Sequence, residues 1–187
     1  MTLFVPLAGC GYYFAGPARS FAPELRTIGV EALANETREI GVEKRLALAI
    51  EREFAMRGPL RVARVPGEGD LVLSVTVRTA EDRPIAFNKK DEVLIYKTLL
   101  ALDLDLKRRD TGELVWQARG LRSSGDYESV ASVIVTTSSE FRRSTLNAED
   151  LGGFTEIQLA ESRRRQTLER MVENLARDIY DQIMEDF

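Results

Sequence analysis

The one thiol of the chain, Cys10, stands in a setting that predicts covalent attachment of a lipid. It is the only cysteine among 187 residues; an apolar run over residues 3–7 and two small residues, Ala8 and Gly9, precede it. A bacterial lipoprotein signal has this order, because an apolar segment enters the membrane, small residues fit the signal peptidase, and sulfur accepts the lipid. The competing interpretation is a structural cysteine buried near the terminus.

Lipidation at Cys10 divides the chain into three parts. Residues 1–9 are the expected signal peptide, which looks truncated because its apolar run is short and no Lys or Arg precedes it. Residues 10–24, rich in Gly, Pro and aromatic residues, are the expected lipidated tether. Residues 25–187 form the expected single domain, and membrane attachment through the lipid would be stable with two or more acyl chains.

The remaining composition argues against catalysis. The chain has no histidine, which removes the commonest general base and the commonest metal ligand. Its acidic residues are not grouped at a Gly-rich turn, and no phosphate-binding, dinucleotide or zinc motif is present. We therefore expect no enzyme activity, no metal and no cofactor. A net charge of -4 gives no reason to expect nucleic acid, and no stretch after residue 10 is apolar enough to span a membrane.

Hydrophobic periodicity divides the domain into strands and two helices. Val42, Leu46, Ile50 and Phe54 form one apolar stripe, which predicts a helix over 40–57 that ends at Gly58-Pro59. Apolar residues at helical spacing predict a second helix over 156–186, in which we expect the basic cluster of residues 163–165 to be solvated surface. The expected strands are 25–33, 60–65, 71–78, 94–107 and 114–121, with a polar turn over 80–91 and a tight hairpin at 110–112.

This order of elements predicts an α+β fold. The expected sheet is antiparallel or mixed, has four to five strands, and carries both helices on one face, because a half-buried sheet needs cover. Residues 123–155 are polar and Gly-rich around a strand-like stretch at 130–137. They predict a long excursion with an extra hairpin, and such segments are often functional.

Several short motifs follow one another along the chain: Cys10-Gly11-Tyr12, Asn35-Glu36-Thr37, Arg57-Gly58, the strand at 70–75, the hairpin segment at 110–116 and the C-terminal helix from Arg163 to Ile179. In their order and spacing they resemble the lipopolysaccharide-assembly lipoproteins (LptE-like). The resemblance implies an outer-membrane lipoprotein that assists assembly of the LptD β-barrel and plugs it while lipopolysaccharide passes to the outer leaflet. Gly11 after the cysteine fits sorting to the outer membrane.

The resemblance also implies contact with lipopolysaccharide through basic residues in loops at one end of the sheet. Lys89 and Lys90, in the turn between two long strands, are the candidates on chemical grounds, because a phosphorylated glycolipid needs cations on a reachable edge. A merely solvated turn is the alternative. A second class of function, a lipid carrier without a barrel partner, requires a roomy apolar cavity between sheet and helices. A carboxylate enzyme would need two acidic side chains converging in a cleft.

Overall fold

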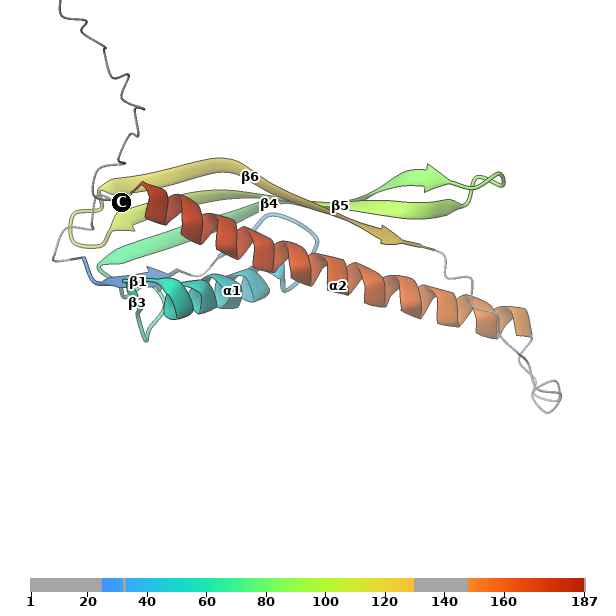
Figure 1. Cartoon of the computed structure of the whole chain (residues 1–187), viewed down its shortest axis with the longest axis horizontal. Coiled ribbons are helices and arrows are strands. Elements are labelled where there is room, and N and C mark those ends of the chain that lie inside the picture. Colours follow the sequence, from blue (N-terminus) through green and yellow to red (C-terminus); the bar gives the residue numbers. More distant parts are fainter. Residues whose placement is uncertain (1–24, 32, 130–147, 187) are drawn as a thin grey trace, which may run out of the picture.

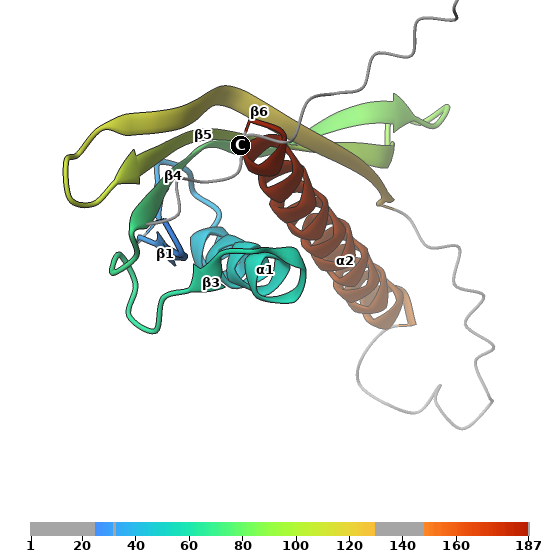
Figure 2. The same ribbon diagram turned by 60° about the vertical axis from the view of Figure 1, so that its left-hand side comes forward.

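The structure is a computed structural model that describes residues 25–31, 33–129 and 148–186. One sheet lies over two helices that cover the same face (Figures 1 and 2). The elements in chain order are β1 (Thr27–Val30), β2 (Ala34–Asn35), α1 (Val42–Arg57), β3 (Arg61–Val62), β4 (Leu71–Phe87), β5 (Val93–Arg108), β6 (Leu114–Glu128) and α2 (Ala148–Glu185). The predicted α+β class is confirmed, although the sheet has six strands instead of four or five.

The sheet is mixed, with an antiparallel half and a parallel half. Strands β4, β5 and β6 form an antiparallel meander. The short strands β1 and β2 both pair parallel to β4, and β3 pairs parallel to β1. A parallel pair needs a crossover connection, and α1 supplies it between β1 and β3.

The core lies between the inner face of the sheet and the two helices. The predicted stripe of α1 is fully buried, and alternate residues of β4 and β5 face it from Leu71 to Val77 and from Leu100 to Leu106. Each large apolar side chain buried in this way stabilises the fold by about 1.5–3 kcal/mol. The α2 residues that complete the core are Leu168, Met171, Val172, Leu175, Ala176, Ile179, Tyr180 and Ile183.

Two irregularities in strand pairing occur at the same position along neighbouring strands of the sheet. The register of β4 against β5 shifts between Val77 and Thr79, and that of β5 against β6 shifts between Leu102 and Leu104. Asp103, on β5, contacts both irregular stretches: it accepts a hydrogen bond from Arg78 Nε at 2.8 Å and one from Gly120 N at 2.9 Å. The hydrogen bond from the Gly120 amide has the largest effect on the pKa of Asp103, and together with the hydrogen bond from Arg78 it holds this pKa below its usual range.

The strands and the second helix are longer than the sequence predicted. Most of the expected turn at 80–91 is strand, because β4 continues to Phe87 and the turn occupies only the residues before Val93. The expected excursion at 123–155 is also shorter, since β6 continues to Glu128 and α2 already begins at Ala148. The strand-like stretch at 130–137 lies outside the described residues.

Candidate functional site

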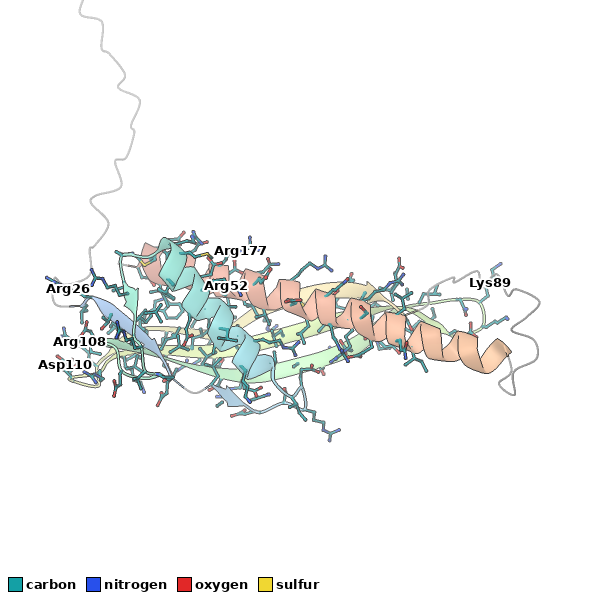
Figure 3. The ribbon with its side chains drawn as sticks, turned by 90° about the horizontal axis from the view of Figure 1, so that it is seen from below. Arg26, Arg52, Lys89, Arg108, Asp110 and Arg177 are labelled. Atoms are coloured by element: carbon teal, nitrogen blue, oxygen red, sulfur yellow. The ribbon has the colours of Figure 1, made fainter. Side chains whose placement is uncertain are left out.

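The chain offers candidate binding residues at its two opposite ends. Cys10 lies outside the described residues, and the described chain starts at Leu25. Arg26, Arg108 and Asp110 lie at this end, whereas Lys89 lies at the other end of the sheet (Figure 3). The segment that leads to Cys10 therefore joins the domain at the end opposite the lysine turn.

The β4–β5 turn, which carries Lys89 and Lys90, has a defined backbone. The side-chain oxygen of Asn88 accepts hydrogen bonds from Lys90 N at 2.8 Å and from Glu92 N at 3.1 Å. Asn88 N donates to the carbonyl oxygen of Glu92 at 2.9 Å, and Asp91 adopts a positive φ of 60°. The two lysine side chains are exposed above this fixed backbone, so the structure places both predicted residues together at the tip of the longest hairpin.

Exposed apolar side chains flank the lysines on both strands. Ile85 is 46% exposed, Phe87 is 53% exposed and Leu94 is 36% exposed. The hairpin tip, residues 83–97, thus combines exposed apolar side chains with the adjacent cations Lys89 and Lys90, and it also contains Arg83, Lys97 and the exposed acidic residues Asp91 and Glu92. Such a surface suits a ligand with an anionic headgroup and apolar chains, because each part of the ligand finds a partner of matching polarity.

An ion-pair network below the tip joins the hairpin to α2 and to the loop that precedes α1. Arg164 of α2 donates from Nη2 to Glu39 and from Nε to Asp82 Oδ2 at 2.6 Å. The other oxygen of Asp82 accepts from the buried Thr98 hydroxyl at 2.6 Å. Burial by itself would lower the pKa of Arg164, but the two carboxylate partners outweigh it and raise that pKa.

The prediction that residues 163–165 are solvated surface is therefore wrong for Arg164. Its neighbours fit that prediction better: Arg163 pairs with the exposed Glu128 at 3.1 Å, and the exposed Arg165 pairs with Glu161 one helical turn away at 3.0 Å. Three adjacent basic residues on a helix give no indication that the middle one is partly buried. Arg164 is distinguished from its neighbours by the position of Asp82 on the inner face of β4.

Two tyrosines cover the inner face of the hairpin beyond this network. The rings of Tyr96 and Tyr127 stack with centroids 5.4 Å apart. Burial, together with the nearby negative charge of Asp82, raises the pKa of Tyr127 to about 12. These contacts fix the β4–β5 hairpin against the rest of the domain as far along its strands as Tyr96.

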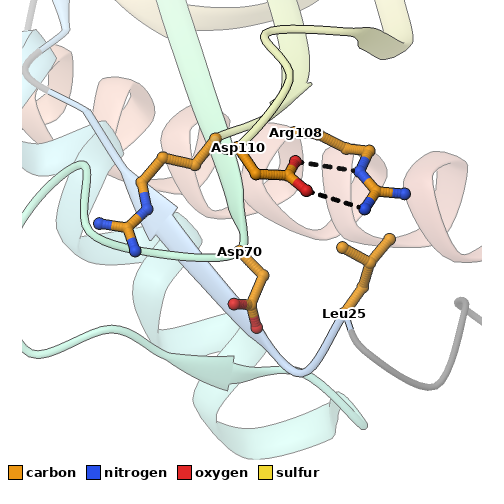
Figure 4. A pocket seen from close by; sticks show the side chains of 5 residues that line it. Leu25, Asp70, Arg108 and Asp110 are labelled. Atoms are coloured by element: carbon orange, nitrogen blue, oxygen red, sulfur yellow. Dashed lines mark hydrogen bonds and ion pairs between the residues drawn. The ribbon is translucent and has the colours of Figure 1, made fainter.

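A hollow of about 450 Å³ lies at the other end, where the described chain begins (Figure 4). Leu25, Asp70, Arg108, Arg109 and Asp110 line it. Asp70 accepts hydrogen bonds from the amides of Arg26 and Thr27, each at 2.9 Å, and these bonds lower its pKa. Four of the five residues that line the hollow are charged, and the hollow lies at the end of the sheet, not between the sheet and the helices.

Within residues 25–31, 33–129 and 148–186, no cluster of His, Cys, Asp and Glu is arranged to hold a metal ion. In the same part of the chain, no helix combines the length and the apolar character needed to cross a membrane.

The structure defines the class of this protein as an α+β domain with a buried apolar core and with charged residues at both ends of its sheet. A family model described as LptE, lipopolysaccharide-assembly, matches residues 25–183. The chain belongs to this family, which confirms the resemblance found in the sequence. It is accordingly a lipoprotein of the cell envelope with a role in lipopolysaccharide assembly, and it is not an enzyme.

Solved structures of other lipoproteins are similar to this chain at low identity. One from Caulobacter crescentus CB15 is 13% identical, with a TM-score of 0.48 over 82% of this chain and 88% of that one. Lipoprotein B from Nitrosomonas europaea is 10% identical, with a TM-score of 0.47 over 94% and 89%. A minor lipoprotein from Acinetobacter baumannii is 13% identical, with a TM-score of 0.43 over 86% and 91%. No curated protein sequence matches the chain.

Proposed function

We propose that this chain is an outer-membrane lipoprotein, anchored through Cys10, that assists assembly of an LptD-type β-barrel and plugs its lumen. The observation that carries the proposal is the family match over residues 25–183. The setting of Cys10 in the sequence supports the lipid anchor. A rigid domain with a filled core suits a plug, because a plug must keep its shape inside the barrel.

We further propose that Lys89 and Lys90 contact the phosphate groups of lipopolysaccharide during its passage. Both lysines are exposed on a backbone that Asn88 fixes, so the two charges are presented close together. The apolar side chains of Ile85, Phe87 and Leu94 lie on the strands just below and suit the acyl chains of the same ligand.

The carrier function receives less support from the fold. A carrier needs an apolar cavity of several hundred Å³ between the sheet and the helices. The hollow of about 450 Å³ is instead lined by four charged residues at the end of the sheet. Core residues at the sheet–helix interface, such as Leu46, Phe54 and Leu104, belong to one apolar cluster and are fully buried.

Co-purification from native membranes in mild detergent tests the partnership, with the wild-type chain compared with Cys10→Ala. Recovery of an LptD-type barrel in stoichiometric amount supports the proposal. A Cys10→Ala chain that keeps the barrel, but leaves the membrane when alone, shows that the lipid is a tether. Recovery of bound lipid with no barrel contradicts the plug and favours the carrier.

Binding of purified lipopolysaccharide tests the tip residues. The double variant Lys89→Glu/Lys90→Glu should bind at least about tenfold more weakly, because two attractive charges become repulsive. Lys107→Glu/Arg122→Glu is the matched control, since it reverses two exposed cations of the sheet that lie outside the tip. Equal losses in both variants would show that binding follows net charge and not the tip.

A further inference from the structure

The outward face of α1 carries a row of apolar and cationic side chains that the fold does not use. Lys44, Leu48, Arg52 and Met56 follow one another at intervals of four along the helix and are all exposed. Leu48 is 63% exposed and Met56 is 65% exposed, although both are large apolar residues. Residues four apart form one ridge on a helix surface, so we call these four residues the α1 ridge.

The ridge is presented rigidly. The opposite side of α1 is fixed in the core by Val42, Leu46, Ile50 and Phe54, each with no exposed surface. At the end of the helix, the ring of Tyr180 packs against Phe54 with centroids 5.1 Å apart, and its hydroxyl donates to Arg57 O at 2.9 Å. The helix therefore cannot rotate to bury the ridge, which stays accessible to a partner.

The charges of the ridge are available to a partner. Neither Lys44 nor Arg52 forms an ion pair with another described residue within 4.0 Å, whereas Arg45 and Arg57 on the same helix do. Arg52 of α1 and Arg177 of α2 both lie on the helical side of the molecule (Figure 3). An acidic partner surface with apolar side chains between its carboxylates would match this pattern.

A second copy of the chain does not fit the ridge. In a parallel two-fold pair, Lys44 would face Lys44 of the second copy and Arg52 would face Arg52. In an antiparallel pair, the register that brings Leu48 onto Leu48 sets Lys44 against Arg52, and the register that brings Leu48 onto Met56 sets Arg52 against Arg52. Like charges would therefore oppose each other in every register that pairs Leu48 with an apolar side chain.

An anionic membrane surface also fits poorly. Helices that lie in a membrane interface bury a broad apolar face, whereas the broad apolar face of α1 is already buried in the core. The whole chain carries a net charge of -4, which opposes adsorption to anionic lipid. A protein wall can instead match a single ridge: its repeat of roughly 6 Å is close to the roughly 6.6 Å between side chains on one face of a β-strand.

We infer that the α1 ridge is the surface through which this chain lies against the inner wall of its barrel partner, along a strip of acidic and apolar side chains. This inference rests on the proposed function and adds to it the face of the domain that meets the wall. The hairpin tip remains turned to lipopolysaccharide, because the ridge belongs to the helical layer and the tip to the end of the sheet.

Photocrosslinking in native envelopes tests the inference. p-Benzoyl-phenylalanine replaces Leu48 or Met56 in the full chain, and it replaces Glu169, an exposed residue of α2, as the matched control. We expect crosslinks to the barrel from Leu48 and Met56 that are at least about fivefold stronger than from Glu169. Crosslinks to lipid, to a second copy or to the chain's own N-terminal segment would each overturn the inference.

Charge reversal gives an independent measurement. The variant Lys44→Glu/Arg52→Glu should recover about tenfold less barrel, with an unchanged circular dichroism spectrum because both residues are exposed. Lys107→Glu/Arg122→Glu, which reverses two exposed cations of the sheet, should recover the wild-type amount. If the wild type recovers the barrel and both variants equal it, the inference fails while the proposed function stands. If the wild type recovers no barrel, the proposed function itself fails.

Discussion

Replacement of Arg164 by Met tests whether the ion-pair network holds the hairpin on the helices. Breaking a buried ion pair costs about 3–5 kcal/mol, whereas an exposed pair contributes about 0–1 kcal/mol. The side chains of Arg164, Glu39 and Asp82 are 23%, 18% and 21% exposed, so they fall between these limits. We expect Arg164→Met to lower the free energy of unfolding by about 2 kcal/mol, a fall in Tm of about 4–8 °C.

The neighbouring arginines supply matched controls. Arg165 is 71% exposed and makes only an ion pair within its own helix, so Arg165→Met should cost about 0.5 kcal/mol or less. Arg163 pairs with an exposed glutamate, and Arg163→Met should also cost under about 1 kcal/mol. Urea unfolding of the three variants, followed by circular dichroism, measures the differences. Equal costs for Arg164→Met and Arg165→Met would refute the reasoning.

A double variant separates the lost charge pair from lost packing. Asp82→Asn removes one charge that Arg164 neutralises and keeps an oxygen that can accept from the Thr98 hydroxyl. The combined Arg164→Met/Asp82→Asn variant should therefore be more stable than the sum of the two single losses predicts, by about 1 kcal/mol. Strict additivity would show that Arg164 and Asp82 are not coupled, so that Arg164 stabilises the fold through Glu39 or through its aliphatic stem.

Three further predictions follow from local geometry. A methyl group at Gly69 would lie 2.5 Å from Leu71 O and 2.7 Å from Ile28 C. We therefore expect Gly69→Ala to lower the unfolding free energy by more than about 2 kcal/mol in urea titration. Gly112→Asn, at an open turn, should not cause such a loss. The pKa of Tyr127 is raised to about 12. This shift stabilises the fold below the unfolded-state pKa of about 10, and the contribution is lost as pH rises through about 12. An absorbance titration should show a step near pH 12 that Tyr127→Phe removes. The lowered pKa of Asp70 contributes stability above the unfolded-state pKa of about 3.9 that is lost as pH falls through the folded-state pKa; Asp70→Asn should flatten the acid limb of a plot of unfolding free energy against pH.

The sequence predicts the core well because its periodicity is unbroken there. The α1 stripe of Val42, Leu46, Ile50 and Phe54 and the alternation of β4 up to Val77 are both buried as expected. Alternation continues to Arg78, and the polar residues that follow over 80–91 predict a turn. The structure shows a register shift at Arg78 instead, after which Ala80 pairs with Leu100 and Asp82 pairs with Thr98. A single bulged residue reverses the phase of all residues that follow, so the same polar sequence continues as strand.

The start of α2 was missed for a different reason. Gly152 and Gly153 lower helix propensity by about 1 kcal/mol each relative to Ala, so residues 148–155 were expected to be part of a loop. The helix nevertheless includes both glycines. Its first three residues, Ala148-Glu149-Asp150, include two acidic residues, a type that the helix dipole favours in the first turn, and propensity is only a weak prior beside the packing of a 38-residue helix.

The candidate tip could be found from the sequence, but the network beneath it could not. Lys89 and Lys90 are adjacent in a polar segment between two apolar runs, and this local signal predicts a turn with two cations. Arg164 and Asp82 are 82 positions apart, and Arg164 and Glu39 are 125 apart. No periodicity links such residues, because their meeting depends on the register shift in β4 and on the path of α2 across the sheet.

The length of the meander gives the proposed role a geometric basis. Strand β5 has 16 residues, and a strand rises roughly 3.3 Å per residue, so the two ends of the sheet are roughly 50 Å apart. The hydrocarbon core of a bilayer is only about 30 Å thick. If the chain is anchored through Cys10 and enclosed by a barrel, as proposed, a domain whose described part begins at Leu25 is long enough to hold Lys89 and Lys90 beyond the far side of that membrane. Shortening β4 and β5 by four paired residues each would withdraw the tip by roughly 13 Å and keep the pleat in phase. Under the proposed function, this change should weaken lipopolysaccharide delivery while the α1 ridge, on a separate layer, still retains the barrel.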